Sequence, residues 1–259
     1  MRNVLTLMRR ELGAYFVSPL AYVILTCVLF ITGLFFYGMV DAYSRYSIQL
    51  AGNPMYAGQL NLHDFVIRGF YSTFGFIMLF VAPMISMRIL AEERRQGTAE
   101  MLLTSPVSTA QLVIGKYLGA LSFGFILLLL SFYLPLFLFI MGARPEAGSL
   151  AAACLGTLLL IGALLSIGIF CSSLTSNQIV AAIISFVICL FFWVVGFLGE
   201  MVGEGPSEYS DFLKALSLNE RFDDFLKGVV DTGSVIFFLS FIAFGLFLTQ
   251  RVVDSNRWR

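Results

Sequence analysis

The residues with the greatest capacity for chemistry in this chain are concentrated in one polar segment, which runs from Ala91 to Lys116 between two apolar runs. Charges of both signs open the segment, and a glycine, a short apolar ridge and a proline follow. An apolar ridge can supply buried contact to a partner while nearby charges fix its orientation. We therefore predict a docking helix for another protein, formed by Glu92, Glu93, Arg94, Arg95, Gly97, Thr98, Glu100, Met101, Leu102, Leu103 and Pro106.

Local signals favour a short helix within this segment. Thr98 can cap it, and Glu100 places a carboxylate at the positive end of the helix dipole. Pro106 disfavours helix at the residue before it and ends the element. Ser108 and Gln111 have the spacing of a capping box, which predicts that the next helix begins there. A simpler alternative stays open, because mixed charges at the end of a membrane span often form a solvated interfacial collar.

No energy-converting chemistry is apparent in the chain itself. A phosphate-binding loop needs G-x-x-x-x-G-K-[ST], but Lys116 is followed by Tyr117, and Ala110 stands where the first glycine should be. No Asp or Glu lies in the central part of an apolar run, as an ion-coupled carrier would require. With His63 as the single histidine, a zinc site or a Ser-His pair is not expected. We predict no catalytic residue, no metal ligand and no cofactor bound by this chain.

The composition places the chain among membrane proteins. Hydrophobic residues make up 59% of it and charged residues 12%, and its formal net charge of zero argues against nucleic acid as a partner. The four cysteines all sit inside apolar runs without C-x-x-C spacing, and they are predicted to be small buried hydrophobes: Cys27, Cys154, Cys171 and Cys189.

Six apolar runs predict an all-α polytopic membrane protein that forms one domain over residues 1–259. A membrane span takes about 20 residues, and the predicted spans cover about 19–40, 68–90, 109–141, 149–171, 178–199 and 232–250. Residues 1–17 alternate at helical period and predict an amphipathic helix in the membrane interface, with its arginines toward anionic headgroups. The apolar run that follows is too long for a cleaved signal peptide, so it is predicted to be retained.

Several details of these spans can be predicted. Arg68 and Arg88 flank the second span and can snorkel to the interfaces. The third span, if helical from Thr109, exceeds the hydrocarbon core, so Lys116 should project into the cytoplasm. The fourth span contains small residues four apart, which permit close helix packing within the chain or, less simply, at a dimer seam: Ala152/Gly156, Gly162/Ser166 and Gly168/Ser172.

The polar connections are predicted on both sides of the membrane. Residues 41–65 form a loop, and residues 200–231 form an acidic outer segment. In the latter, Ser217 and Glu220 match a capping box. Apolar residues at helical spacing follow, which predicts an amphipathic helix resting on the outer membrane face: Phe222, Phe225, Leu226 and Val229.

The distribution of Lys and Arg predicts the orientation. Six spans put both termini on one side, and ten cations share that side: Arg2, Arg9, Arg10, Arg88, Arg94, Arg95, Lys116, Arg251, Arg257 and Arg259. The other side has six: Arg45, Arg68, Arg144, Lys214, Arg221 and Lys227. By the positive-inside rule, the termini and the docking segment face the cytoplasm.

The segment also carries a resemblance to a known family, in the pattern Glu92-Glu93, Gly97-Thr98, Glu100, Leu102-Leu103, Ser105-Pro106 and Gly115-Lys116. It resembles the cytoplasmic segment of permease subunits in the ABC-2 group of ATP-driven transporters, and is most similar to the gliding-motility-type and nitrous-oxide-reductase accessory permeases. The similarity extends over the whole chain, in length, span count and the Arg-Trp-Arg ending.

The resemblance implies an ABC-2 (type V exporter-like) permease fold in the bacterial inner membrane. It implies two copies of a cytoplasmic ABC ATPase that bind ATP and Mg²⁺ and receive residues 91–108, and a second permease copy, expected to form a homodimer. It further suggests a conduit at spans two and five, for which four aromatic residues are candidates: Tyr71, Phe74, Phe76 and Phe80. Aromatic residues on a span are also common in packed cores and on lipid-facing surfaces.

Two functions are therefore expected. The first is the permease of an ATP-driven exporter. The alternative is a non-transporting unit that relays ATPase-driven motion to an extracytoplasmic partner, since the two outer segments are larger than plain connections require. Resemblance to gliding-type systems implies an auxiliary membrane protein with a large outer domain. A passive channel is disfavoured, because no ring of polar or charged residues recurs along a span.

Overall fold

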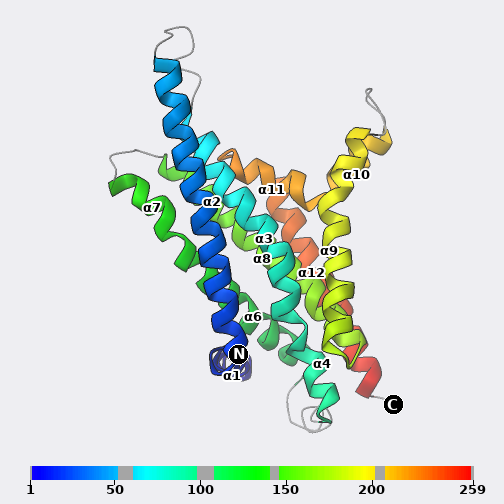
Figure 1. Cartoon of the computed structure of the whole chain (residues 1–259). Helices are drawn as coiled ribbons and strands as arrows, with labels where there is room; N and C mark the ends of the chain where they lie inside the picture. The colour runs from blue at the N-terminus through cyan, green and yellow to red at the C-terminus, as the bar shows by residue number, and fades with distance from the viewer. Residues whose placement is uncertain (1, 52–60, 98–107, 141–145, 202–207, 258–259) are drawn as a thin grey trace.

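The computed structural model describes residues 2–51, 61–97, 108–140, 146–201 and 208–257, and these residues form helices joined by turns, without a β-strand among them (Figure 1). In chain order the elements are α1 (Arg2–Val17), α2 (Pro19–Ala51), the π-helical turn η1 (His63–Ile67), α3 (Arg68–Ser86), α4 (Arg88–Arg95), α6 (Thr109–Ser131), α7 (Tyr133–Ile140), α8 (Ala147–Leu174), α9 (Gln178–Met201), α10 (Glu208–Leu216), α11 (Leu218–Leu226) and α12 (Thr232–Arg257).

Six helical stretches of the described chain are long and apolar enough to cross a membrane: Pro19–Leu50, His63–Arg95, Thr109–Ile140, Ala147–Leu174, Gln178–Gly199 and Thr232–Ser255. Both chain ends lie at one end of this bundle, together with α1 and α4 (Figure 1). We call this the terminal end, and the opposite one, where α10 and α11 lie, the α11 end. The predicted fold class, an all-helical protein with six membrane helices, is confirmed.

Helix α2 is longer than predicted. The first span was expected to end near Val40 and a loop to begin at Asp41, but the helix continues to Ala51. Residues 41–51 are polar yet contain neither glycine nor proline, and polarity alone does not end a helix. Arg45 Nε also lies 2.9 Å from Asp41 Oδ2, one helical turn earlier, which supports this extension.

The third span is interrupted, where one helix was predicted. A turn at Phe132 separates α6 from α7, and the Phe132 N–H is shared between the carbonyls of Leu128 and Leu129, at 3.0 and 3.2 Å. Pro135 follows in the first turn of α7 and has no N–H to donate to the Ser131 carbonyl. The proline therefore accounts for the break.

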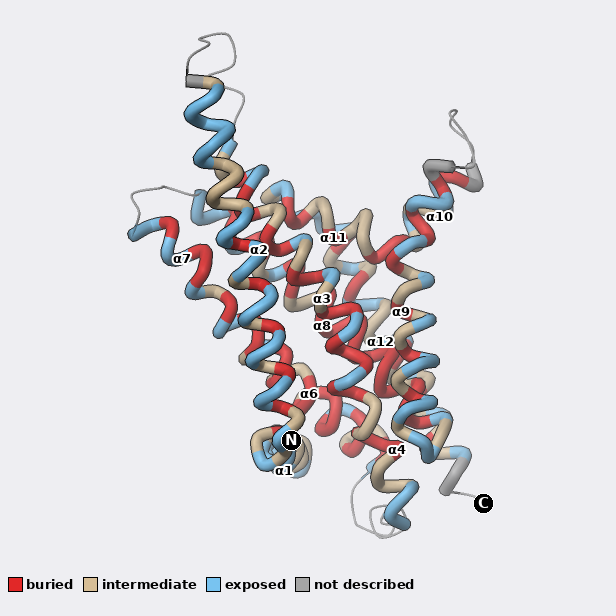
Figure 2. The backbone as a smooth tube through the Cα atoms, in the orientation of Figure 1, coloured by how far each residue is buried: buried red, intermediate tan, exposed pale blue. Residues whose placement is uncertain are grey.

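Helix α8 passes through the middle of the bundle and is buried over most of its length, whereas α2 exposes most of its surface (Figure 2). The small residues of α8 make its central position possible. A β-carbon on Gly162 would lie 2.8 Å from Tyr117 Oη of α6, and one on Gly168 would overlap the hydroxyl of Ser86 on α3. The small residues of α8 thus pack against neighbours within the chain, which was the simpler of the two interpretations.

Helix α11 lies across the bundle at the α11 end, and its predicted apolar face packs largely against other helices of the chain. Its buried side chains are Leu218, Phe222, Phe225 and Leu226. Glycines of three other helices leave room for it. A β-carbon on Gly75 of α3 would lie 2.8 Å from Phe222 Cε1, and one on Gly156 of α8 would lie 2.6 Å from Phe225 Cγ. One on Gly196 of α9 would lie 2.7 Å from Ser217 Oγ, just before α11.

The start of α11 was predicted correctly, but its end was not. The Ser217 hydroxyl accepts the Glu220 N–H at 3.3 Å, so the predicted cap is confirmed. Val229 was expected on the buried face of the same helix, but it is 56% exposed. Helix α11 ends two residues before Gly228, whose φ of +81° turns the chain away.

Candidate functional site

Helix α4 contains the described part of the predicted docking segment. Glu92, Glu93, Arg94 and Arg95 form its charged half, and Gly97 follows it. The other predicted docking residues lie outside the described residues: Thr98, Glu100, Met101, Leu102, Leu103 and Pro106. The described chain resumes at Ser108, where the predicted capping box is confirmed. Ser108 Oγ accepts the Gln111 N–H at 3.3 Å, and Gln111 Oε1 accepts the Ser108 N–H at 3.4 Å.

Helix α4 projects from the bundle with one end buried. Ile89, Leu90 and Ala91 are buried in the first turn, whereas Arg95 in the last turn is exposed. Helix α4 ends just before Gly97, which was predicted to belong to the docking helix. Gly97 has a φ of +70°, the left-handed conformation that commonly ends a helix. A β-carbon would meet nothing within 4 Å there, so glycine is favoured by the backbone conformation alone.

Lys116 holds the buried end of α4. Its side chain, only 2% exposed, comes from α6, and its Nζ lies 2.7 Å from Glu93 Oε1 and 2.9 Å from Glu11 Oε1. Nζ also donates to the Ile89 carbonyl at 2.8 Å. These three acceptors match the three N–H donors of an ammonium group. We call Lys116, Glu93 and Glu11 the Lys116 cluster; it joins α6, α4 and α1.

Lys116 was predicted to project into the cytoplasm, but the structure covers its side chain with protein. The length of the third span can be counted from the sequence, but length does not show that α1 covers its first turns. Two features could have indicated the cluster: Lys116 is the one formal charge between Arg95 and Arg144 other than Glu100, and Glu11 is the one acidic residue before Asp41. A lone charge at the end of a buried helix needs a partner.

Helix α1 reaches this position because α6 has glycines where the two helices cross. A β-carbon on Gly115 would lie 2.7 Å from Leu7 Cβ, and one on Gly119 would lie 2.6 Å from Glu11 Cβ. Spacing of four residues puts both glycines on one face of α6, the arrangement that allows close helix approach. Gly115 and Lys116 do not belong to a phosphate-binding loop. Gly115 instead lets α1 approach α6, and Lys116 pairs with the Glu11 carboxylate of α1.

Arg88 also faces α1, where it was predicted only to snorkel. Its guanidinium carbon lies 4.5 Å from the centre of the Tyr15 ring, and Nη2 is 3.4 Å from the Ala14 carbonyl. Burial raises the pKa of Tyr15, so its hydroxyl stays protonated and donates to the Ile85 carbonyl at 2.9 Å. Tyr15 therefore joins α1 to the end of α3.

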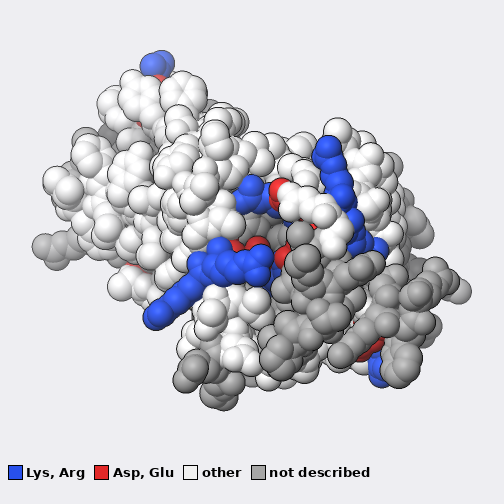
Figure 3. All heavy atoms as spheres, turned by 90° about the horizontal axis from the view of Figure 1, so that it is seen from below, with Lys and Arg blue, Asp and Glu red and all other residues white. Residues whose placement is uncertain are grey.

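A cleft of about 470 Å³ lies between α1, α4 and the start of α6. Its charged lining residues are Arg10, Glu11, Arg88, Glu92, Glu93 and Lys116. Seen from the terminal end, Lys and Arg side chains surround a hollow in which acidic side chains are visible (Figure 3). This surface combines a projecting charged helix with an anchored base, which suits it to receive a protein partner and transmit force from it.

The candidate conduit residues do not share one face. Tyr71 and Phe74 are fully buried, and Tyr71 Oη lies 3.0 Å from Cys154 Sγ of α8. Phe76 and Phe80 are 47% and 46% exposed. The exposed pair continues onto α9, since the Phe80 and Phe186 ring centres are 4.9 Å apart and those of Phe76 and Trp193 are 6.4 Å apart. The structure thus brings Phe76 and Phe80 together with α9, and places Tyr71 and Phe74 in the core.

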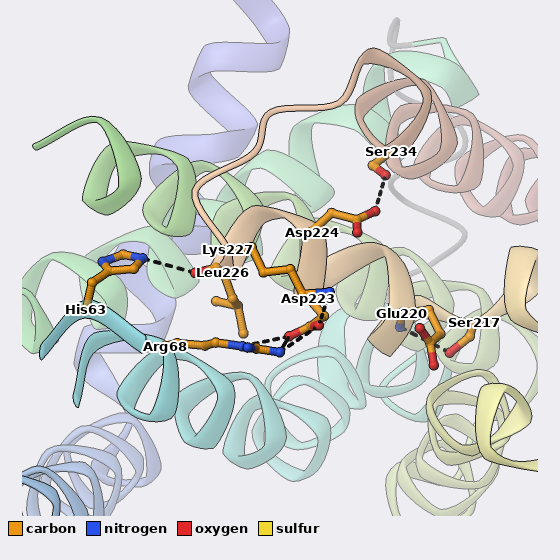
Figure 4. Close-up of polar contacts among 9 residues, drawn as sticks. All are labelled: His63, Arg68, Ser217, Glu220, Asp223, Asp224, Leu226, Lys227 and Ser234. Carbon is orange, nitrogen blue, oxygen red and sulfur yellow. Dashed lines mark hydrogen bonds and ion pairs between the residues drawn. The ribbon is translucent and has the colours of Figure 1, made fainter. Parts of the chain in front are cut away.

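A second polar region lies at the α11 end (Figure 4). Arg68, which flanks the second span, donates from Nη2 to both carboxylate oxygens of Asp223, at 2.7 and 2.8 Å. Lys227 Nζ lies 2.8 Å from Asp223 Oδ2. Burial opposes ionisation of Asp223, but the hydrogen bonds from Lys227 and Arg68 outweigh it and lower its pKa below the ordinary value. We call these three residues the Asp223 cluster; it joins α3 to α11.

The remaining residues with ligand chemistry are dispersed. Among the described residues, no group of three or more His, Cys, Asp or Glu could hold a metal ion. His63 lies at the base of α3 with Nε2 3.2 Å from the Leu226 carbonyl (Figure 4). All four cysteines are free, and Cys171 and Cys189 are buried as predicted. Cys27 was predicted to be buried but is exposed, because it lies on the outward side of α2 while Ile24 and Val28 face the bundle.

Comparison with known proteins bears on this arrangement. The family model described as ABC-2 family transporter protein matches residues 41–219, which is more than half of the chain. Among curated proteins, none matches the chain.

Proposed function

The chain belongs to the ABC-2 family of transporter membrane proteins, and from this premise we propose that a separate cytoplasmic ATPase drives it through α4 and residues 96–108. A multi-pass membrane protein of this family has the permease role in an ABC transporter, and such permeases work with an ATPase partner. In the proposal, two ATPase copies bind ATP and Mg²⁺. This chain contributes neither a catalytic residue nor a cofactor.

The Lys116 cluster is the observation that carries the proposal. A helix that receives force from a partner must be attached firmly at its base, because otherwise the helix moves without moving the rest of the bundle. Removing one partner from a buried ion pair typically costs about 3–5 kcal/mol, so the base of α4 does not separate easily from α1 and α6. Arg94 and Arg95 lie beyond that attachment, and Arg95 is exposed where a partner can reach it.

The same proposal fixes orientation and assembly. The terminal end faces the cytoplasm of a bacterial inner membrane, because most of the Lys and Arg residues belong to that side. Two copies of the permease form a homodimer. Their conduit lies at the aromatic face shared by α3 and α9, where the exposed Phe76 and Phe80 contact the partly buried Phe186 and the buried Trp193. Tyr71 and Phe74 support this face from inside and do not line it.

The docking assignment is tested by co-purification of the ATPase. The double variant Leu102→Asp/Leu103→Asp replaces the predicted apolar ridge with charge, and we expect it to lose most of the bound ATPase. Phe212→Asp is the matched control, since Phe212 is a 66% exposed apolar residue on α10 at the opposite end of the bundle. Undiminished ATPase in the double variant would contradict docking through this segment.

A second candidate function is supported by the α11 end. Helix α2 extends to Ala51 and, together with α10, projects from that end of the bundle (Figure 1). These projections suit a unit that relays ATPase-driven motion to another protein. The resemblance to gliding-motility-type permeases suggests that this partner is an auxiliary membrane protein with a large outer domain. ATPase activity that depends on this partner, without solute movement in vesicles, would favour the relay over the exporter.

A further inference from the structure

The junction between α3 and α4 lies against α8. The backbone stays helical through Met87, whose φ and ψ are −54° and −35°, but the two helices are separated there in hydrogen bonding. Helix α3 closes with the Met87 N–H bonded to the Pro83 carbonyl at 2.9 Å. The first donors of α4 then need acceptors from outside α3 or from the turn itself.

Ser172 of α8 supplies that acceptor. The N–H groups of Leu90 and Ala91 lie 3.1 and 3.0 Å from Ser172 Oγ. The same hydroxyl donates to the Met87 carbonyl at 2.8 Å. A hydroxyl has one donor and two acceptor positions, so three bonds to the base of α4 use its full capacity. Insertion of a side chain beside the hydrogen-bond ladder is a known cause of helix breaks.

The packing around Ser172 makes this contact tight. Ser172 is fully buried, and Gly168, one turn earlier on α8, lets the Ser86 side chain approach so closely that a β-carbon would overlap it. Two successive turns of α8 therefore face the junction, one by a glycine and one by a hydroxyl. The Lys116 cluster holds α4 to α1 and α6, but Ser172 is its polar link to the central helix.

Beyond Ser172 the chain leads directly to α9. Helix α8 ends at Leu174, and Asn177 Oδ1 accepts the N–H of Ile179 at 3.0 Å, which caps the start of α9. Helix α9 contributes the partly buried Phe186 and the buried Trp193 to the aromatic face that it shares with α3. A displacement of α4 that moves Ser172 thus reaches that face over one short connection.

We propose that Ser172 is a positioning residue for energy coupling: its hydroxyl makes α4 and α8 move together, so that force on α4 reaches α9. This inference rests on the proposed function, since it assumes that an ATPase pushes on α4. It goes further by naming the link through which the motion enters the membrane bundle. Ser172 touches neither nucleotide nor substrate and acts only through the backbone of α4.

The test uses the full chain in complex with its ATPase, with amide hydrogen exchange as the readout. In Ser172→Ala, the Leu90 and Ala91 amides should exchange roughly tenfold faster, as expected for the loss of one hydrogen bond. ATPase co-purification should be unchanged. With ATP and an ATPase variant that binds but does not hydrolyse it, the nucleotide-dependent change in exchange across the first half of α9 should fall several-fold.

Ser173→Ala is the matched control, because Ser173 is equally buried in the same helix but donates only to the Phe170 carbonyl of α8, at 2.6 Å. It should respond to ATP like the wild type. Ser172→Thr keeps the hydroxyl and should restore the response. A full response of α9 in Ser172→Ala, or equal loss in Ser173→Ala, would overturn the inference. Failure of the wild-type chain to retain the ATPase would instead overturn the proposed function, whereas faster exchange at Leu90 and Ala91 would still establish the Ser172 contact.

Discussion

The Lys116 cluster and the Asp223 cluster both fasten a short helix to the bundle, but they do so in different surroundings. At the terminal end, the Lys116 side chain is 2% exposed, and the glutamates beside it are 15% exposed. At the α11 end, the Arg68 and Asp223 side chains are 37% and 28% exposed. The first cluster is shielded from water and the second is partly solvated.

This difference in exposure indicates which interactions attach each helix to the bundle. In a shielded cluster every member depends on the others, since an unpaired buried charge is costly. In a partly solvated pair, water and salt replace much of the interaction. Helix α4 thus has a shielded charge cluster in addition to its buried apolar base, whereas α11 is held chiefly by Phe222 and Phe225 packed against glycines, and its ion pairs add orientation. The helix proposed to receive force has the attachment that is harder to open.

The largest expected effect follows from removing the cation of the shielded cluster. Lys116→Met leaves Glu11 and Glu93 together without it and should lower the free energy of unfolding by about 3–5 kcal/mol. Denaturant titration in mixed micelles would measure this. Lys227→Met is the control at a 50% exposed lysine, where a loss below about 1 kcal/mol is expected. Equal losses in the two variants would show that burial does not distinguish the clusters.

A smaller effect is expected from the partly solvated pair. Arg68→Met should lower the free energy of unfolding by about 1 kcal/mol, at the upper end for exposed pairs because the contact with Asp223 is bidentate. A double-mutant cycle with Asp223→Asn isolates the pair. Arg45→Met serves for comparison, since Arg45 is 76% exposed beside Asp41 and should cost almost nothing. A coupling energy between Arg68 and Asp223 as large as the stability loss in Lys116→Met would show that the terminal end is not held more strongly than the α11 end.

The smallest effect concerns acid. The folded-state pKa of Asp223 is lowered, so its contribution to stability is fully present above its ordinary pKa of about 4 and is lost as pH falls through the lower folded value. The difference in unfolding free energy between wild type and Asp223→Asn should therefore stay constant from neutral pH to about pH 5 and shrink below it. A difference that grew on acidification would mean that the carboxylate is not held in its charged form.

The sequence was sufficient wherever the determining residues are close together in the chain. Six apolar runs predicted six membrane helices, and the caps at Ser108 and Ser217 formed as their spacing indicated. The end of α4 near Gly97 is another local feature, because it depends on one residue's backbone preference. Local signals of this kind do not require knowledge of the fold.

The remaining features depend on residues far apart in the chain. Lys116 meets Glu11 across 105 positions, and Arg68 meets Asp223 across 155. Ser172 was identified only as a small residue suited to helix packing, because the amino-acid sequence does not show which backbone N–H groups a serine hydroxyl will contact. Tyr71 and Phe74 were grouped with Phe76 and Phe80 by type, whereas the helical turn places the two pairs on different faces.

The glycines beneath α11 also bear on the order in which the protein can be made. Gly75, Gly156 and Gly196 all precede α11 in the chain, as does Arg68. A growing chain folds from its N-terminus, so these glycines and Arg68 have already been synthesised when Phe225 leaves the ribosome. Helix α11 can therefore pack on α3, α8 and α9 first, and α12 then adds Phe238 beside Phe225 and the Ser234 hydroxyl, which bonds to Asp224.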